Sequence, residues 1–339
     1  MKKIKTEEAI GHVLCHDITQ IIKGVSKGAV FRKGHIICEE DIPVLLSVGK
    51  EHVYIWECDD SMLHENDAAA ILRDISLGAN MHATEAKEGK IELIADCDGL
   101  LTIRRQGLQA VNSLGEMMIA SRHGGFAVKK GDVLAGMRVI PLVISKEKME
   151  GAKEAAGTEP LFNVAPFTAK TAGVVTTGSE VYKGRIADTF TPVIEDKLAE
   201  YGIAVTQHVT LSDDPAAITA AIQDMLAQSV DMVFCTGGMS VDPDDQTPLA
   251  IKNTGVRIVS YGAPVLPGAM FLLAYTDDGR PVAGLPGCVM YSKRTIFDLV
   301  LPSLAAGVEI KADELTRLGE GGLCLNCPVC TFPNCGFGK

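Results

Sequence analysis

The sequence has few aromatic residues, and this shortage limits the ligands that it can recognise. Only 5% of its 339 residues are aromatic, and Trp56 is the single tryptophan. Stacking platforms for nucleic-acid bases are therefore scarce. Positive charge is also in short supply, because 32 Lys and Arg stand against 43 Asp and Glu, a formal net charge of −11. Nonspecific nucleic-acid binding depends on Lys and Arg that neutralise phosphates, so we expect no nucleic-acid partner.

Long apolar runs are absent as well. No stretch is long enough to span a bilayer, and no apolar segment typical of a secretory signal follows the first residues, Met1 to Glu8. We therefore expect a cytoplasmic protein without a membrane partner. The sequence also lacks a Gly-x-x-x-x-Gly-Lys-Ser/Thr loop and a Rossmann fingerprint, which argues against an ordinary nucleotide-binding protein. Ten cysteines in a cytoplasmic chain favour free thiols or metal ligands over disulfides.

What the sequence does contain is enough apolar material for two or three cores, since hydrophobic residues make up 47% of it. Residues 1–58 mix short strands with one helix. Residues 59–168 begin with a polar helical segment that acts as a linker and continue as a small β-rich domain, with turn signals such as Asp98-Gly99. Residues 169–308 form an α/β domain, and residues 319–339 form a cysteine-rich tail that is neither helical nor strand-like.

Strands and helices alternate in the α/β domain. Apolar runs predict strands over 172–176, 203–210, 231–235, 270–275 and 281–284. Amphipathic segments predict helices over 188–201, 214–228, 246–253 and 287–301. This alternation predicts a three-layer architecture with a mostly parallel sheet covered on both faces.

Glycine-rich and acidic turns follow these strands, and the carboxyl ends of parallel strands meet at one crevice. The Gly237-Gly238 turn leaves backbone amides free to bind phosphate or a similar anion. Asp242, Asp244 and Asp245 repel one another, which a divalent cation would relieve, and Mg²⁺ prefers one or two carboxylates plus phosphate oxygens. Simpler interpretations stay open: the glycines serve a tight turn, and Asp245 caps the next helix, as Asp214 caps the helix after Pro215.

The motifs within residues 172–305 follow one order, which is Thr177-Gly178-Ser179-Glu180, Ile186-Ala187-Asp188, Asp213-Asp214-Pro215, Thr236-Gly237-Gly238-Met239-Ser240, Asp245 with Thr247, Pro267-Gly268 and Gly284-Leu285-Pro286-Gly287. No single motif is specific, but weak motifs rarely occur together in one strand–helix frame. This ordered set resembles the molybdopterin-binding domain shared by molybdenum cofactor biosynthesis proteins.

The first segment is similar to part of the molybdopterin molybdenumtransferases, which indicates a transferase-like branch. The similarity rests on Phe31-Arg32-Lys33-Gly34-His35, a helix that ends at Gly49 and a strand to Trp56. Those enzymes carry lysines around the Pro-Gly turn, where this sequence has Leu266 and Ala269. Because lysine neutralises an anionic substrate, the change affects catalysis more than binding. Two further departures are Gly124, where the enzymes have an acid, and Leu285-Pro286-Gly287-Cys288-Val289 in place of Leu-Pro-Gly-Asn-Pro.

The resemblance implies molybdopterin or its adenylated form as the ligand. Glu180, Asp214 and Asp245 would be catalytic and would position Mg²⁺, with Asp213 as an alternative to Asp214. Molybdate would be inserted as substrate, with release of AMP; the alternative is a non-catalytic carrier, chaperone or sensor. A homo-oligomer is also implied. The residues implied in ligand binding are Thr177, Gly178, Ser179, Asp188, Asp213, Gly237, Gly238, Ser240, Thr247, Pro286 and Gly287.

The tail carries four closely spaced cysteines, Cys324, Cys327, Cys330 and Cys335. Such a short stretch has no core of its own, so a metal is the natural organiser. The first three match the Cys-x2-Cys-x2-Cys run of bacterial ferredoxins, which favours an iron–sulfur cluster slightly. Zinc bound by four thiolates and an unliganded, reactive tail stay open as alternatives.

Overall fold

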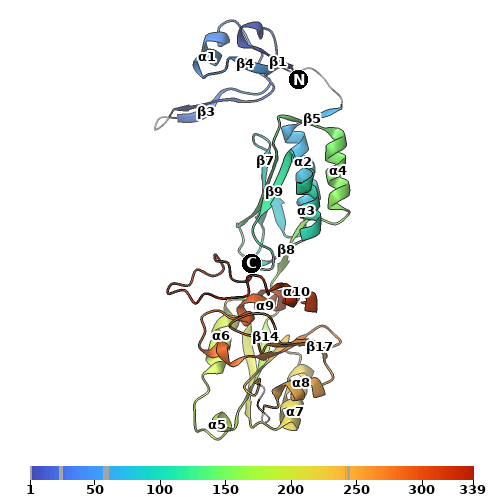
Figure 1. Ribbon diagram of the computed structural model, residues 1–339, viewed down its shortest axis with the longest axis vertical. Helices are drawn as coiled ribbons and strands as arrows, with labels where there is room; N and C mark the ends of the chain where they lie inside the picture. Colours follow the sequence, from blue (N-terminus) through green and yellow to red (C-terminus); the bar gives the residue numbers. More distant parts are fainter. Residues whose placement is uncertain (1, 23–25, 56–60, 241, 243–244) are drawn as a thin grey trace. The chain divides into compact units, whose positions relative to one another are not determined.

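The computed structural model describes residues 2–22, 26–55, 61–240, 242 and 245–339, shown in Figure 1. The chain divides into two compact units, and each contains segments from more than one part of the sequence. Unit 1 comprises Met1–Asp96, Ile103–Arg122 and Gly131–Asn163, and unit 2 comprises Cys97–Thr102, His123–Lys130 and Val164–Lys339. No helix in the described residues is long and apolar enough to cross a bilayer.

The first part of unit 1 consists of two antiparallel strand pairs and two short helices. Val53 and Ile55 are buried and alternate with exposed neighbours, which confirms the strand expected there. Its expected end, Trp56, lies outside the described residues. The pairs are β1 (Lys2–Lys5) with β4 (His52–Ile55) and β2 (Ile18–Ile22) with β3 (Ser26–Phe31), and the helices are the 3-10 helix η1 (Thr6–Glu8) and α1 (Asp41–Ser47).

The remainder of unit 1 is an antiparallel sheet with helices. The helix expected over 59–87 is limited to α2 (Glu65–Ser76), because the backbone becomes extended at Leu77 and a strand follows. The sheet has the order β6 (Met81–Ala83), β7 (Lys90–Ala95), β11 (Val133–Val139), β9 (Met117–Ser121). The other elements are β5 (Met62–His64), which pairs with β12 (Val143–Ser145), and the helices α3 (Arg105–Ser113) and α4 (Lys146–Ala156).

Unit 2 is built on a six-stranded sheet in which four neighbouring strands pair in parallel and β18 (Leu272–Tyr275) runs in the opposite direction. The sheet has the order β15 (Ala204–Leu211), β14 (Thr171–Thr177), β16 (Met232–Thr236), β19 (Pro281–Leu285), β18, β17 (Arg257–Tyr261). The last two strands pair antiparallel, so the expected mostly parallel sheet is confirmed with an antiparallel edge. A small three-stranded sheet has the order β10 (Ala127–Val128), β8 (Gly99–Ile103), β13 (Phe162–Pro166).

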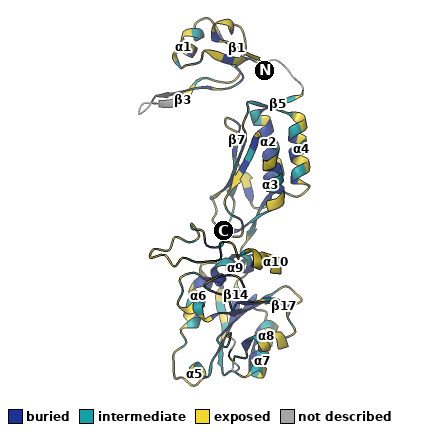
Figure 2. Cartoon of the chain, in the orientation of Figure 1, coloured by how far each residue is buried: buried dark blue, intermediate teal, exposed yellow. Residues whose placement is uncertain are grey.

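Helices cover both faces of the six-stranded sheet, which confirms the three-layer prediction. Successive side chains on β14 enter different cores: Val174 packs in the core that contains α6 and α9, and Val175 in the core that contains α7 and α8. The inner strands β14, β16, β19 and β18 are buried, whereas the outer helix surfaces are exposed (Figure 2). The helices are α5 (Ser179–Tyr182), α6 (Phe190–Ala199), α7 (Pro215–Ala227), α8 (Thr247–Asn253), α9 (Ile296–Ala305) and α10 (Ala312–Arg317).

The helix expected over 287–301 is divided in two. A 3-10 turn, η2 (Gly287–Met290), is followed by a loop, and α9 starts only after Thr295. Thr295 and Asp298 form a capping box, which fixes this start. The tail beyond residue 319 contains neither helix nor extended strand, as expected, and only Leu323 makes a single bridge to Leu266.

Candidate functional site

The turns that follow β14 and β16 are held together at the carboxyl edge of the sheet. The Thr177 Oγ1 atom lies 3.1 Å from Thr247 Oγ1, and the Thr247 hydroxyl donates to the Gly237 carbonyl at 2.9 Å. Both threonines are buried. Thr177 and Thr247, predicted to bind a ligand, therefore join the turns that shape the site.

Gly237 and Gly238 allow the two turns to approach closely. Both have positive φ angles, 81° and 54°. A Cβ on Gly237 would lie 2.1 Å from the Thr177 carbonyl oxygen, and one on Gly238 would lie 2.8 Å from Thr247 Oγ1. Packing thus explains both glycines, as the simpler interpretation held. The same turn also forms part of the wall of a cavity, so the two interpretations are compatible.

A cavity of about 370 Å³ opens at this edge of unit 2. Predicted ligand-binding residues and the predicted catalytic acid Asp245 line it together, although they come from three different turns. No Lys or Arg occurs among its described lining residues. The lining consists of Gly237, Gly238, Met239, Ser240, Asp245, Ala269, Met270, Pro286, Gly287, Cys288 and Tyr291.

Asp245 is the single carboxylate among the described residues that line this cavity. Its Oδ2 accepts a hydrogen bond from the Ser240 amide at 2.8 Å, so it stabilises its own loop. It does not cap α8, whose N-cap is Gln246 without a side-chain capping bond. Burial and the charge of Asp245 raise the pKa of Tyr261, whose hydroxyl donates to the Met239 carbonyl at 3.2 Å. Asp244 lies outside the described residues.

The other predicted acids have local partners. Asp213 Oδ2 accepts from the amide and hydroxyl of Ser179, at 3.1 and 3.2 Å, and joins the turns after β14 and β15. Asp214 caps α7 through the Ala216 amide at 2.9 Å, as the simpler interpretation held. Glu180 lies exposed in α5, directly after Gly178 and Ser179. These residues surround the same edge of the sheet but do not line the cavity.

The acids do not form a ready-made metal centre. Within the described part of the chain, no three His, Cys, Asp or Glu side chains are placed to hold one ion. Magnesium does not require such a cage, because it commonly takes one or two carboxylates and completes its coordination with water and substrate phosphates. Asp245 fits that lesser role, whereas Glu180 and Asp214 do not reach the same cavity.

Asp188 stabilises the start of α6. Its Oδ1 accepts from the backbone amides of Phe190 and Thr191, at 2.9 and 3.1 Å, and its Oδ2 lies 3.3 Å from His208 Nε2. Burial raises the pKa of Asp188, but hydrogen bonds from Thr191, Phe190 and Thr176 outweigh it and hold the pKa below its usual value. The contact between Asp188 and His208 could not be predicted from the sequence. A single histidine on a strand does not form a spaced pair with another ligand residue.

Several cavity residues were not predicted from sequence. Ala269 and Met270 line the cavity beside the turn where transferases carry lysine. Tyr291 lies in the loop that interrupts the expected closing helix, so its place depends on where α9 begins. Cys288 was noted for its position in the ligand turn, and it does line the cavity. Burial raises the pKa of this thiol above its usual value.

The tail forms a second cavity of about 490 Å³ in unit 2. All four tail cysteines line it, together with Lys293, Arg294 and Tyr291. Main-chain bonds anchor the start of the tail, since Leu266 donates to Gly322 and Cys324 donates to Leu266, both at 2.8 Å. Leu266, one of the two positions expected to replace a lysine, therefore holds the tail through its backbone.

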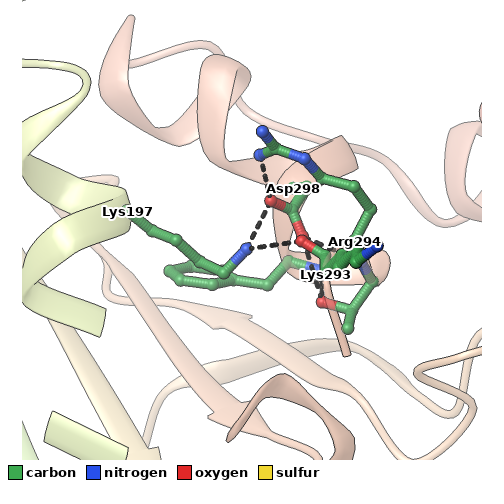
Figure 3. A network of polar contacts seen from close by, with 6 residues as sticks. Lys197, Lys293, Arg294 and Asp298 are labelled. Carbon is green, nitrogen blue, oxygen red and sulfur yellow. Dashed lines mark hydrogen bonds and ion pairs between the residues drawn. The ribbon is translucent and has the colours of Figure 1, made fainter. Parts of the chain in front are cut away.

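A buried ion network fixes the loop that carries Lys293 and Arg294 (Figure 3). Asp298 Oδ1 lies 2.5 Å from Lys197 Nζ and 2.8 Å from an Arg294 nitrogen, and Lys197 also donates to the Lys293 carbonyl at 3.4 Å. The Lys197 and Asp298 side chains are only 10% and 3% exposed. The network thus joins α6 and α9 beside the loop that lines the tail cavity. The Arg294 guanidinium also stacks over Phe332, 4.9 Å from its ring centroid.

Comparison with known proteins identifies two segments of the chain. Residues 173–306 match a family described as a probable molybdopterin binding domain. Residues 3–57 match a domain of unknown function, DUF8806, so their similarity to transferases stays a prediction.

Curated relatives match over a shorter region. A CinA-like protein of Mycobacterium tuberculosis is 40% identical over 76 residues, 22% of this chain and 18% of that protein. A CinA-like protein of Mycobacterium sp. (strain MCS) is 38% identical over 82 residues, 24% of this chain and 20% of that protein. The matched segment thus spans about a fifth of the length of these relatives.

Solved structures are similar to the chain in part. The molybdopterin biosynthesis enzyme MoaB from Thermus thermophilus is 19% identical, with a TM-score of 0.33, and the match covers 41% of this chain and 97% of that chain. CinA from Thermoplasma acidophilum is 22% identical, with a TM-score of 0.34, covering 40% and 98%. The ordered motifs, the three-layer fold and the family match over 173–306 lead to one conclusion: this chain contains a domain of the molybdopterin-binding family.

Proposed function

We propose that unit 2 binds molybdopterin or its adenylated form in the 370 Å³ cavity at the carboxyl edge of the sheet. The observation that carries the proposal is that the Gly237-Gly238 turn, Ser240 and the Pro286-Gly287 turn line one cavity. Backbone amides in such turns suit the phosphate end of the ligand. The apolar side of the cavity, with Met239 and Met270, suits the pterin.

The charge of the cavity adds a requirement for a cation. Asp245 lines the cavity, and none of the other described lining residues is a Lys or Arg. A bound phosphate would therefore lie near a carboxylate with no cationic side chain beside it. Two negative groups at close range repel each other unless a cation lies between them. We therefore propose that Mg²⁺ bridges Asp245 and the phosphate, and that binding depends on magnesium.

The magnesium requirement is tested by equilibrium dialysis of the full chain with molybdopterin, with and without Mg²⁺. We expect Mg²⁺ to strengthen binding about tenfold, because one charge-assisted contact contributes at least about 1.4 kcal/mol. Asp245→Asn should abolish this increase. Asp242→Asn, which removes an exposed acid three residues away, should retain it and serves as the matched control. An Asp245→Asn protein that binds with undiminished magnesium dependence would refute the bridging role.

The chain could serve the bound ligand in two ways, as a carrier, chaperone or sensor or as an enzyme. The cavity supports a carrier, chaperone or sensor best, because Ala269 and Met270 line it beside the turn where transferases have lysine. Insertion of molybdate with release of AMP is the second candidate, and the position of Asp245 in the cavity favours it. Assembly into a homo-oligomer, implied by the family, stays a prediction.

Complementation separates these two functions. A strain that lacks its molybdenumtransferase would be rescued by this chain if the chain inserts molybdate, and the Asp245→Ala variant would then lose the rescue while remaining folded. A carrier binds molybdopterin in the dialysis assay but does not rescue the strain. Rescue that persists in the Asp245→Ala variant would exclude the proposed role of this acid in insertion.

A further inference from the structure

The four tail cysteines form a group that the molybdopterin site does not use. Cys324, Cys327, Cys330 and Cys335 all line the 490 Å³ cavity, although nothing in the tail's secondary structure brings them together. None of the four lines the smaller cavity beside Gly238. The tail cavity therefore requires its own explanation.

Residues 325–330 of the tail are all exposed, whereas Phe332 and Cys335 pack against the main core of unit 2. The ends are fixed, because Cys324 bonds to the Leu266 carbonyl and Phe337 is buried in the main core of unit 2. Between them, Leu325 and Val329 are 79% and 76% exposed, and Cys327 and Cys330 are exposed as well. A loop with exposed apolar residues and thiols but no core is typical of a segment organised by metal.

The cavity and the spacing of the cysteines favour a cluster over a single ion. Zinc, with Zn–S bonds of about 2.3 Å, holds four sulfur atoms within about 4 Å of one another. In the described residues no three His, Cys, Asp or Glu side chains are placed to hold one metal ion. The four cysteines line one cavity of about 490 Å³, which has room for a centre of several metal atoms, and the first three follow the Cys-x2-Cys-x2-Cys spacing of bacterial ferredoxins. We propose that the thiolates of Cys324, Cys327, Cys330 and Cys335 together bind one iron–sulfur cluster.

Cationic groups are placed where such a cluster needs them. Thiolates give the cluster a negative charge, and Lys293 and Arg294 line the same cavity. The Lys293 ammonium donates to the Pro328 carbonyl at 3.1 Å, between Cys327 and Cys330. Asp298, itself paired with Lys197, holds Arg294 in place. These two cations offset the cluster charge, and neither lines the molybdopterin cavity.

The test uses the full chain purified without oxygen and incubated with iron salts and sulfide. We expect about four iron and four sulfide per chain, a brown colour with broad visible absorbance, and an electron paramagnetic resonance signal after reduction. No pterin is added, so the result does not depend on the proposed function. A colourless protein with one zinc per chain would overturn the proposal. A metal-free protein whose four tail thiols all react with a thiol reagent after the incubation would overturn it as well.

Cysteine variants assign the ligands. Cys327→Ser and Cys330→Ser should lower the iron content to below about a quarter of the wild-type value. Cys38→Ser changes another exposed cysteine, in unit 1, and should leave the iron content unchanged. Lys293→Ala provides a second test if a cysteine variant fails to fold. The cluster should remain in this variant, but its reduction potential should fall because a cation beside it is lost. Equal iron loss in the Cys38 and Cys327 variants would contradict the assignment.

Discussion

Gly237 shows how the position of one residue determines the site. Its backbone lies against the Thr177 carbonyl, and its φ angle of 81° is one that residues with a Cβ rarely adopt. Because Gly237 has no Cβ, the two turns can lie in close contact. The same property determines the shape of the cavity wall. The sequence predicted the turn correctly but left open whether packing or ligand binding explains it, because Gly-Gly suits both.

Replacing this glycine should cost stability and binding together. Gly237→Ala is expected to lower the free energy of unfolding by about 3 kcal/mol or more, through backbone strain and overlap with Thr177. Gly255→Ala is the matched control, since Gly255 has a φ of 88° but open space around it, and should cost about 1–2 kcal/mol. Urea unfolding measures both. Equal losses would show that the contact with Thr177 is unimportant.

At the scale of elements, the start of α9 determines where both cavities lie. The capping box of Thr295 and Asp298 begins the helix after residue 295, which leaves Tyr291, Lys293 and Arg294 in a loop. The sequence pattern predicted one continuous helix from Gly287, because the apolar residues on both sides of this loop have a helical spacing. The buried partner of Asp298, Lys197, lies 101 positions away and gave no local signal.

Loss of the Asp298 charge should destabilise unit 2 strongly. Asp298→Asn keeps a cap for Thr295 but leaves the Lys197 ammonium buried without its carboxylate, which costs about 3–5 kcal/mol. Asp313→Asn removes the partner of Arg317 in an exposed pair on α10 and should cost less than about 1 kcal/mol. Chemical denaturation distinguishes the two. Similar small losses in both variants would mean that the stability of unit 2 does not depend on the Lys197–Asp298 ion pair.

At the scale of the whole molecule, the fold of unit 2 was more predictable than its tail. Strand–helix alternation predicts the sheet because the inner strands bury both faces, as β14 does through Val174 and Val175. It does not predict the antiparallel edge, because apolar content alone does not reveal the direction in which a strand such as β18 runs. Nor does it predict that the tail joins the core, because that depends on two distant anchors, Leu266 and Phe337.

The second anchor provides a test of whether the tail is part of unit 2. Phe337 is 4% exposed, and Phe337→Ala should lower the unfolding free energy by about 3–5 kcal/mol, as core phenylalanine truncations do. Leu325→Ala alters an apolar tail residue that is 79% exposed and should change it by less than about 0.5 kcal/mol. A Phe337→Ala protein as stable as the Leu325→Ala protein would show that the tail is an independent appendage.

Tyr291 belongs to the walls of both cavities. A ligand that changes the position of this ring in one cavity therefore changes the shape of the other. Such coupling is reciprocal by thermodynamic necessity: the factor by which an occupied tail alters affinity for the pterin equals the factor by which the pterin alters affinity for the tail's occupant. Tyr291 is thus the shared lining residue through which a ligand in one cavity would alter affinity at the other.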